Sequence, residues 1–519
     1  MKNRFFLVII LTTLLSACSK NRALEEEHNV APDEVNYDVL SASVSLSLSD
    51  ILKITNARRE QYLSPSVEIA KELGAGLASR SFDYMETFFT RETQEDYISS
   101  ADAISDAELL FASMREYYPG YAYFGGDDVF LPIFEEILNY LRETETWAVS
   151  DFAYTIYESL KPYIKDNHFK IGDHVFSVNY LFYTNASAIF DKTDNGFRHR
   201  GNGLYVDEVH GYDLDTLFRL ALDPSGGFYY TPIAMLPDAD DFAEYIVLNI
   251  VYANGAQTVI PLYLQISVRF PWQNVSLHNE RDFPVVTVRR MDSEHPDWQL
   301  HEDASRFISF AYELQNDPVV IVDARSNGGG YGYMPQKWLH ALTGKIVSSK
   351  HISFTARSEQ EIQQWIEDGS ERDEGEWRGI SRVSDILTYS PNLMAHGDHV
   401  IRYSPSEIIR REQLLILLID RFTASAAETF TNLMLSVENT LIIGQNTSGS
   451  INFDAIYPTR LPLSGLFFQH GHTMYIFPIG FFEGRGLEPD IWTNGDALYA
   501  TINMLERYFE QTPIPKYKP

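Results

Sequence analysis

The feature that most constrains this fold is a series of short apolar runs that alternate with helical patterns between residues 284 and 519. Residues 319–322 and 414–419 are aliphatic throughout, and each run is too short to span a bilayer. Such runs are typical of strands that are buried on both faces of a sheet. Residues 304–314 and 426–437 carry apolar residues at helical spacing. We therefore expect residues 284–519 to form an α/β domain with crossover helices.

Upstream of this domain the pattern changes twice. Residues 50–171 carry apolar residues at three- and four-residue steps, which predicts a helical N-terminal domain. Residues 172–283 are rich in β-branched and aromatic residues, and Asn254-Gly255 between two apolar runs is typical of a hairpin. This β-rich part weakly resembles a PDZ-like module, which would capture an extended peptide on a sheet edge. A β-rich insertion that binds nothing explains the pattern equally well.

The first residues predict export. Two basic residues precede an apolar run at residues 5–15, which is too short for a membrane span and typical of a secretory signal. The run leads to Leu-Ser-Ala-Cys, which ends at Cys18 and resembles the lipobox of bacterial lipoproteins. In that family the cysteine is lipidated and becomes the new N-terminus. Residues 1–18 would then be the signal peptide and lipobox.

Cys18 is the only cysteine of the chain, so no disulfide can form within it. The lipobox resemblance implies a lipid-anchored protein of the bacterial cell envelope that faces the periplasm or the exterior. An ordinary signal peptide with a chance cysteine is the alternative. Residues 19–49 are expected to be a tether, and the strict alternation at residues 43–49 predicts a strand at its end.

The net charge argues against one large class of partners. The formal charge of the chain is −31 at pH 7. Because nucleic-acid binding needs clustered lysine and arginine to neutralise phosphates, we expect no nucleic-acid partner.

A serine stands where a buried strand leads into a helix. Ser425 follows the run at residues 414–419 and has small neighbours, Ala424 and Ala426. The start of a helix offers free backbone N–H groups and a positive dipole end, which can stabilise an oxyanion beside a nucleophilic serine. Serine is also a favoured helix N-cap, and this structural role explains Ser425 equally well when it is taken alone.

Two other motifs supply parts of a hydrolase site. Residues 323–330 end in three glycines, which let the backbone turn sharply and bring N–H groups close to a ligand. Residues 483–490 place a carboxylate in a tight turn, where it could orient a base. Taken singly, each motif indicates only a tight loop.

Together these motifs resemble the tail-specific, or C-terminal processing, serine protease family. The resemblance covers roughly residues 284–500 and rests on four ordered motifs at residues 323–330, 424–428, 444–449 and 486–490. It implies a ClpP/crotonase-like ββα-spiral fold and a nucleophile at Ser425. It also implies an oxyanion hole from the amides of Gly330 and Ala426, with Gly329 as the alternative to Gly330.

The chain departs from this family at the general base. The processing proteases use a lysine directly after the motif at residues 444–449, and Ser450 stands there instead. No lysine occurs from residue 351 to residue 515, so we expect no Ser/Lys dyad. The tricorn core protease branch of the same superfamily uses Ser, His and Glu, and the chain resembles that branch more closely.

This second resemblance implies His168 as the base and Glu483 as its partner. His168 lies in an Asp-Asn-His sequence directly after a predicted helix, which resembles the D-x-H element of tricorn-like peptidases. His168 would take the proton of Ser425, and Glu483 would hold the imidazole tautomer and stabilise its charge. Asn167 occupies the position of a serine that helps to orient the histidine in that branch, and it is the candidate for this role here.

Other histidines compete with His168. The chain has 14 histidines, and the rivals are His351, His396, His399, His470 and His472. A surface histidine after a helix C-terminus is the plain alternative for His168. The His-Gly-His and His-Gly-Asp-His sequences have neither i, i+4 helical spacing nor a nearby third ligand, so we expect no metal, and no cofactor is expected either.

We therefore expect a serine-type endopeptidase that acts on peptide or protein substrates through an acyl-enzyme at Ser425. A non-catalytic peptide-binding lipoprotein on a peptidase fold is the alternative, and the missing lysine and Asn167 motivate it. Hydrolysis of a non-peptide ester is a third reading, because a fold does not fix the substrate.

Overall fold

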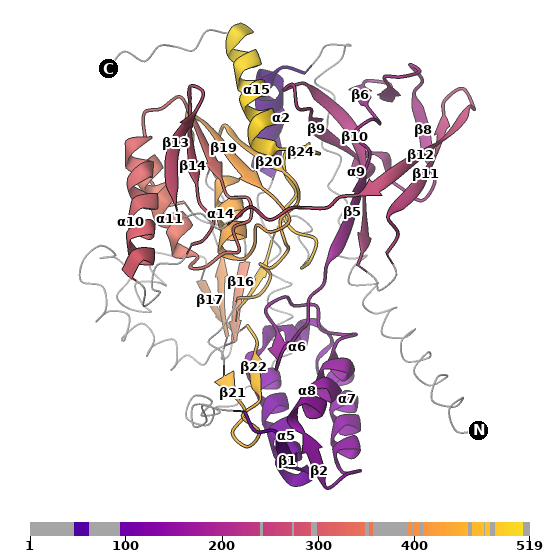
Figure 1. Cartoon of the computed structure of the whole chain (residues 1–519), viewed down its shortest axis with the longest axis vertical. Coiled ribbons are helices and arrows are strands. Elements are labelled where there is room, and N and C mark those ends of the chain that lie inside the picture. The colour runs from indigo at the N-terminus through magenta and orange to yellow at the C-terminus, as the bar shows by residue number, and fades with distance from the viewer. Residues whose placement is uncertain are drawn as a thin grey trace.

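Figure 1 shows a computed structural model of the chain. The structure describes residues 46–61, 94–238, 242–271, 275–291, 298–347, 352–356, 393–396, 399–403, 408–454, 459–471, 473–477 and 483–511. The predicted signal, Cys18 and the tether up to residue 45 lie outside the described residues. In the described part of the chain, no helix combines the length and the apolar character that crossing a bilayer requires.

The centre of the molecule is a parallel sheet. Its strands are β14 (Phe283–Thr287), β15 (Val319–Asp323), β19 (Leu414–Ile419), β20 (Thr440–Gly444) and β24 (Ile491–Thr493), adjacent in this order and all parallel. Every residue of β15, β19 and β20 is buried. Strands covered on both faces need a nearly continuous apolar run. The buried Asp323 at the end of β15 is paired with Arg289 and Arg325. These buried parallel strands confirm the α/β class that the aliphatic runs predicted.

Helices cover both faces of this sheet (Figure 1). On one face, α10 (Trp298–Glu313), α11 (Tyr333–Thr343) and α14 (Ala426–Met434) share a core with alternate residues of the strands. On the other face, α2 (Leu48–Gln61) and α15 (Ala497–Gln511) share a second core with the remaining strand residues. The strand ends that lead to α11 and α14 therefore lie between two packed layers.

Alternation predicted a strand at residues 43–49. This prediction is wrong for its last two residues, because α2 begins at Leu48. The Ser47 hydroxyl accepts from the N–H of Asp50 at 3.2 Å, and the Ser47 N–H donates to the Asp50 carboxylate at 3.2 Å. This reciprocal cap starts a helix. The buried ion pair between Arg59 and Asp490, at 2.8 Å, then ties α2 to the central sheet rather than to the helical region.

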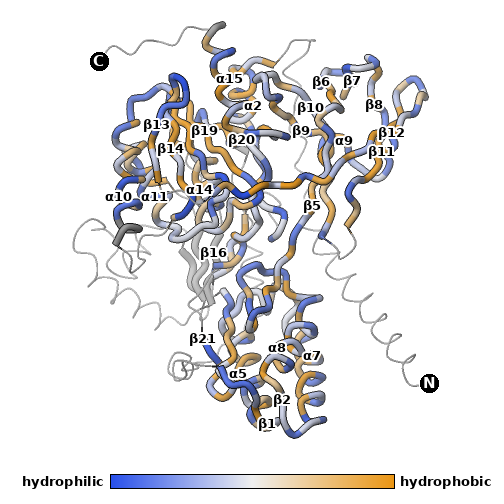
Figure 2. Tube along the Cα trace, in the orientation of Figure 1, coloured by the Kyte–Doolittle hydropathy of each residue, from blue (hydrophilic) through white to orange (hydrophobic). Residues whose placement is uncertain are grey.

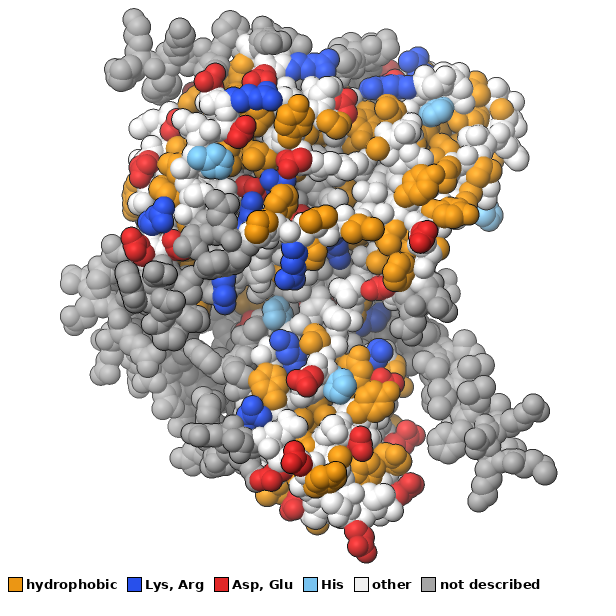
Figure 3. All heavy atoms as spheres, in the orientation of Figure 1, with side chains coloured by type: hydrophobic (Ala, Val, Ile, Leu, Met, Phe, Trp, Pro, Cys, Tyr) orange, Lys and Arg blue, Asp and Glu red, His pale blue; other side chains and the backbone are white. Residues whose placement is uncertain are grey.

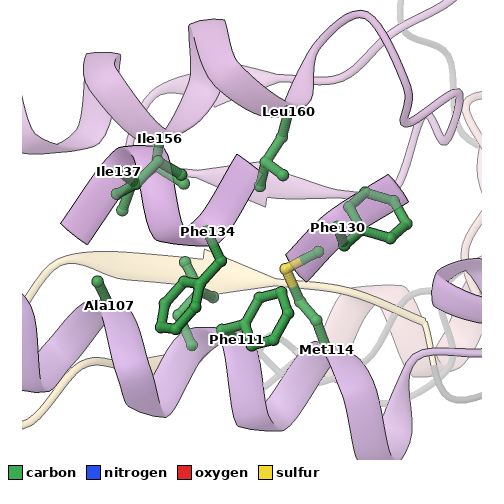
Figure 4. A pocket seen from close by; sticks show the side chains of 9 residues that line it. Ala107, Phe111, Met114, Phe130, Phe134, Ile137, Ile156 and Leu160 are labelled. Carbon is green, nitrogen blue, oxygen red and sulfur yellow. The ribbon is translucent and has the colours of Figure 1, made fainter. Parts of the chain in front are cut away.

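A separate group of helices lies within residues 50–171, where the sequence predicted a helical domain. It consists of α5 (Ser100–Tyr117), α6 (Pro119–Tyr123), α7 (Gly126–Leu141) and α8 (Val149–Leu160), with the short strands β1 (Tyr97–Ser99) and β2 (Thr146–Ala148). A cavity of about 20 Å³ lies between the apolar side chains of α5, α7 and α8 (Figure 4). Its size and apolar lining make it a packing gap rather than a ligand site.

The β-rich part is continuous with the central sheet. β24 pairs with β9 (Phe218–Leu222), and the order continues through β10 (Phe228–Pro237), β5 (Tyr180–Thr184), β12 (Gln257–Leu264), β11 (Tyr245–Tyr252) and β8 (Val206–Val209). The hairpin predicted around Asn254-Gly255 is confirmed, since β11 and β12 pair antiparallel across it. Smaller elements complete this part: β6 (Phe190–Thr193), β7 (Gly196–His199) and α9 (Leu214–Leu217). At the opposite edge of the sheet, β13 (Ser276–Glu280) pairs antiparallel with β14.

Segments near the C-terminus reach into the helical region. β22 (Phe467–Gln469) pairs with β21 (Thr459–Arg460) and with β3 (Lys170–Ile171), which in turn pairs with β4 (His174–Val175). β23 (Thr473–Ile476) pairs with β16 (Ile352–Ala356) in a sheet that also contains β17 (Leu393–His396) and β18 (His399–Tyr403). Phe468 therefore shares a core with Phe169 and the helices. The pairing of β22 with β3 and this shared core bring the segment around residue 168 to the central domain.

Candidate active site

Ser425 occupies a strained turn between β19 and α14. Its backbone has φ 53° and ψ −117°, a conformation that residues other than glycine rarely adopt. The Ser425 carbonyl accepts hydrogen bonds from the N–H groups of Glu428 at 2.8 Å and Thr429 at 2.9 Å. The turn therefore holds the serine at the N-terminus of α14, where backbone amides lack helical acceptors.

Glu428 holds this turn in place. Its buried carboxylate accepts from the N–H of Ser425 at 2.9 Å and the N–H of Ser450 at 2.8 Å through one oxygen. The other oxygen accepts from the N–H of Gly449 at 2.7 Å and the hydroxyl of Thr447 at 2.6 Å. One carboxylate thus joins the serine turn to the loop after β20.

The glycine loop lies directly against the serine. A Cβ atom added at Gly329 would meet the Ser425 Cβ at 2.8 Å, and the φ of Gly329 is +97°. The Gly329 N–H already donates to Asn327 Oδ1 at 2.9 Å. The N–H groups of Gly330 and Ala426 make no hydrogen bond within the described residues. Of the predicted donors, Gly330 and Ala426 are therefore the ones left available for an oxyanion.

His168 stands in a loop that buried polar groups fix. Its N–H donates to Asp166 Oδ1 at 2.7 Å, and the Tyr118 hydroxyl donates to Asp166 Oδ2 at 2.9 Å. Gln469 of β22 donates to the His168 carbonyl at 2.9 Å. The helical region and β22 together therefore set the position of His168.

The structure brings Glu483 to His168. One ring nitrogen of His168 and one carboxylate oxygen each from Glu483 and Asp166 lie within 4.8 Å of one another. The Glu483 carboxylate also accepts from the N–H groups of Asn167 at 3.0 Å and Asn452 at 3.0 Å. The predicted base and its carboxylate partner are thus neighbours.

Asn167 does not bind the His168 ring, as its predicted orienting role would require. Its amide nitrogen donates to the carbonyl of Gly449 at 2.8 Å and to Ser450 Oγ at 3.1 Å. Its amide oxygen accepts from the N–H of Val178 at 2.8 Å. Asn167 therefore fixes the loop through its side chain and contacts Glu483 through its backbone.

Ser425 and His168 are not joined directly. No hydrogen bond between the two described residues connects the Ser425 hydroxyl with the His168 ring, and His168 Nδ1 is buried without a hydrogen-bond partner. Ser450 lies between the two segments, because its N–H binds Glu428 and its Oγ accepts from Asn167. The predicted nucleophile and base are therefore linked through Glu428, Ser450 and Asn167.

Burial sets the charge state of this cluster. It lowers the pKa of His168 to about 4, helped by the charge of Lys170 and opposed by a hydrogen bond to the Phe453 backbone. Burial raises the pKa of Asp166 to about 7. Burial and then the charge of Asp166 raise the pKa of Glu483. At neutral pH the imidazole is uncharged and able to accept a proton, while the two carboxylates compete for one.

The raised pKa of Asp166 should make stability depend on pH. The folded pKa is raised from 3.8 to about 7, so the contribution of this group is complete below the unfolded value and is lost as the pH rises through 7. We expect Asp166→Asn to be less destabilising, relative to the unsubstituted protein, at pH 8 than at pH 5. Urea unfolding at both pH values measures this difference. The exposed control Asp151→Asn should show no such change, and parallel curves for Asp166→Asn would contradict the assignment.

Sequence reasoning missed two groups of this site. Glu428 lay inside a recognised motif, but its four donors come from two loops, which no local pattern indicates. Tyr118 comes from the helical region, 48 residues before Asp166. Its hydroxyl had no signal in the sequence beyond an aromatic residue in an apolar helix.

Among the rival histidines, only His470 has a described side chain. It is buried, and its Nε2 lies 2.8 Å from the hydroxyl of Ser113 in the helical region. His351, His396, His399 and His472 have side chains outside the described residues. The ring of His470 packs in an aromatic core, with centroids 5.4 Å from that of Tyr118 and 6.1 Å from that of Phe169.

The spacing of Asp166, His168 and Glu483 would by itself admit a cation. The carboxylate oxygens, however, are already acceptors. Those of Asp166 bind a hydroxyl and an amide, and those of Glu483 bind backbone amides. The cluster is therefore better matched to holding an imidazole than to ligating a metal.

Comparisons with known proteins identify the family. Residues 285–493 match the model of peptidase family S41, and no curated protein matches the chain. Among solved structures, mature CPAF is 12% identical, with TM-score 0.41, over 80% of this chain and 99% of that one. The photosystem II D1 C-terminal processing protease is 13% identical, with TM-score 0.35, over 76% of this chain and 92% of that one. The tricorn protease is 11% identical, with TM-score 0.32, over 79% of this chain and 36% of that one.

The S41 model spans the serine turn, the glycine loop and the Glu483 turn. The glycine loop contacts Ser425, and the Glu483 turn pairs with the loop after β20 that Glu428 holds. The chain has a mixed α/β fold with a helical N-terminal region. Through residues 285–493 it belongs to peptidase family S41 and is a serine peptidase, a hydrolase.

Proposed function

We propose that this peptidase is lipid-anchored in the cell envelope and hydrolyses peptide bonds through an acyl-enzyme on Ser425. The observation that carries the proposal is the strained turn of Ser425 at the start of α14, beside the amides of Gly330 and Ala426, which make no hydrogen bond within the described residues. A nucleophile placed there has candidate donors for the oxyanion that its attack creates. The lipobox that ends at Cys18 supports the anchor.

His168 and Glu483 supply the proton chemistry in this proposal. The neutral His168 ring accepts the proton of Ser425 as Oγ attacks the scissile carbonyl, and it returns that proton to the leaving amine. Glu483 stabilises the imidazolium in between. Water then attacks the acyl-enzyme with His168 again as the base. The His168 ring must approach Ser425 when substrate binds, as catalytic hydrogen bonds often tighten only in the complex.

Two observations favour a second candidate, a peptide-binding protein without turnover. Ser450 stands at the position where the processing proteases carry their lysine, and Ser425 makes no hydrogen bond to His168. Such a protein would bind peptides but would not activate its serine.

One experiment separates the two candidates. Membranes from a bacterium that expresses the full chain are treated with a fluorophosphonate probe, which reacts with activated serines. We expect one adduct, mapped by mass spectrometry to Ser425 and lost in Ser425→Ala. In Cys18→Ser the labelled chain should move to the soluble fraction. An unlabelled but folded chain would favour the binding protein, and a labelled chain that stays in the membrane without Cys18 would refute the anchor.

A further inference from the structure

A connecting segment crosses the molecule beside the serine turn. Residues 265–270, which we call the strap, run from β12 toward β13 without helix or strand (Figure 1). At the end of the strap, the N–H of Phe270 donates to Ser326 Oγ at 3.0 Å. The Arg269 guanidinium lies 4.7 Å from the ring centroid of Phe422. Since Ser326 leads into the glycine loop and Phe422 into the serine turn, the strap lies alongside both.

The side chains of the strap alternate as those of a strand would. The Ser267 hydroxyl donates to Gln445 Oε1 at 2.7 Å and faces the protein. Its neighbours Ile266 and Val268 are 81% and 76% exposed. No backbone hydrogen bond involves residues 266–269 in the part of the chain that the structure describes. The strap therefore presents two large aliphatic side chains and an unpaired backbone to solvent.

This apolar surface continues onto the β11–β12 hairpin. Tyr245, Val247, Val259 and Tyr263 are exposed on its outer face, and the rings of the paired Tyr245 and Tyr263 lie 6.4 Å apart. Figure 2 shows hydrophobic residues in orange along the connection to the central sheet, and Figure 3 shows hydrophobic side chains gathered over the hairpin. Apolar side chains are thus exposed both on the hairpin and on the strap that follows it toward the serine turn.

We propose that the strap binds the substrate polypeptide as an added β-strand, with apolar substrate side chains at alternate positions against Ile266 and Val268. This inference rests on the proposed function, because a peptidase must hold an extended chain beside its nucleophile. Backbone pairing gives such a strand affinity, and the alternate side chains give it selectivity. Arg269 is exposed at the end nearest the serine turn, so the preferred segment carries no basic residue there.

The test measures binding in Ser425→Ala, so that it does not depend on turnover. Two fluorescein-labelled ten-residue peptides serve as probes, one with valine at alternate positions and one with serine in its place. We expect Ile266→Ser/Val268→Ser to raise the Kd of the valine peptide about tenfold, measured by anisotropy, and to leave the weak binding of the serine peptide unchanged. The control is Ile346→Ser, because Ile346 is a similarly exposed isoleucine, at 74%, after α11.

Each result bears on the proposal. Equal affinities in the double variant and the Ile346→Ser control would overturn it. The proposal would also be overturned if the Ser425→Ala protein sediments as a dimer and becomes a monomer after the double substitution. A second copy of the chain would then cover the strap. The thermal midpoint shows whether the double variant is folded. Failure of the fluorophosphonate probe to label Ser425 would refute the proposed function and leave the peptide-binding result intact.

Discussion

Replacing His168 with alanine is expected to lower kcat for peptide hydrolysis about 10⁴-fold while the protein stays folded. The proposed mechanism needs a neutral imidazole that accepts the Ser425 proton, and burial keeps the His168 ring neutral by lowering its pKa to about 4. Glu483 lies close enough to stabilise the imidazolium. Without the ring, the described cluster keeps only the carboxylates of Asp166 and Glu483 and has no imidazole to take the serine proton.

The measurement is single-turnover cleavage of a quenched fluorescent peptide, with the kinetics of fluorophosphonate labelling as a second readout. His278→Ala is the matched control, because His278 is an exposed histidine on β13 and should not affect either rate. Added imidazole should partly restore cleavage in His168→Ala, which a merely structural role would not explain. Wild-type kcat in His168→Ala would place the base elsewhere.

The central sheet was predictable because its signal is local. Strands such as β15 and β19 need nearly continuous apolar runs to lie between two helical layers, so each run can be recognised without knowing which strands it pairs with. The start of α2 was mispredicted, because alternating serines indicated a strand and the cap between Ser47 and Asp50 outweighed that pattern.

The site was predictable only where a motif carried it. Ser425 and its glycine loop lie in one domain and follow buried strands. The histidine loop does not, since Asn167 and the Glu483 that binds its N–H are 316 residues apart. β22 and Tyr118 bring them together through contacts that leave no periodicity in the sequence. The side-chain contacts of Asn167 with Gly449 and Ser450 are also long-range, so its position next to His168 in the sequence did not predict them.

Replacing Glu428 with alanine should damage both the fold and the serine. Four donors would lose their buried acceptor: the N–H groups of Ser425, Gly449 and Ser450 and the hydroxyl of Thr447. Each buried donor left without a partner costs about 1–3 kcal/mol, so we expect the free energy of unfolding to fall by about 4 kcal/mol or more. Urea unfolding measures this loss.

The same substitution should slow fluorophosphonate labelling of Ser425 about 100-fold. The φ of 53° at Ser425 is unfavourable for a residue with a side chain and persists only while its surroundings enforce it. With Glu428 gone, the turn can relax and carry the hydroxyl away from the amides of Gly330 and Ala426. The labelling rate of the folded protein therefore reports the position of the Ser425 hydroxyl. A loss of stability alone would not slow it.

A graded pair of variants makes this result specific. Glu428→Gln keeps the size of the side chain, but its NH₂ group must face donors, so labelling should lie between that of the unsubstituted protein and that of Glu428→Ala. Glu438→Ala is the control, because Glu438 only pairs with the exposed Arg410 at 3.5 Å and should change stability by at most about 1 kcal/mol. If Glu428→Ala lowers stability but leaves the labelling rate of the folded protein unchanged, Glu428 supports the fold and does not position the nucleophile.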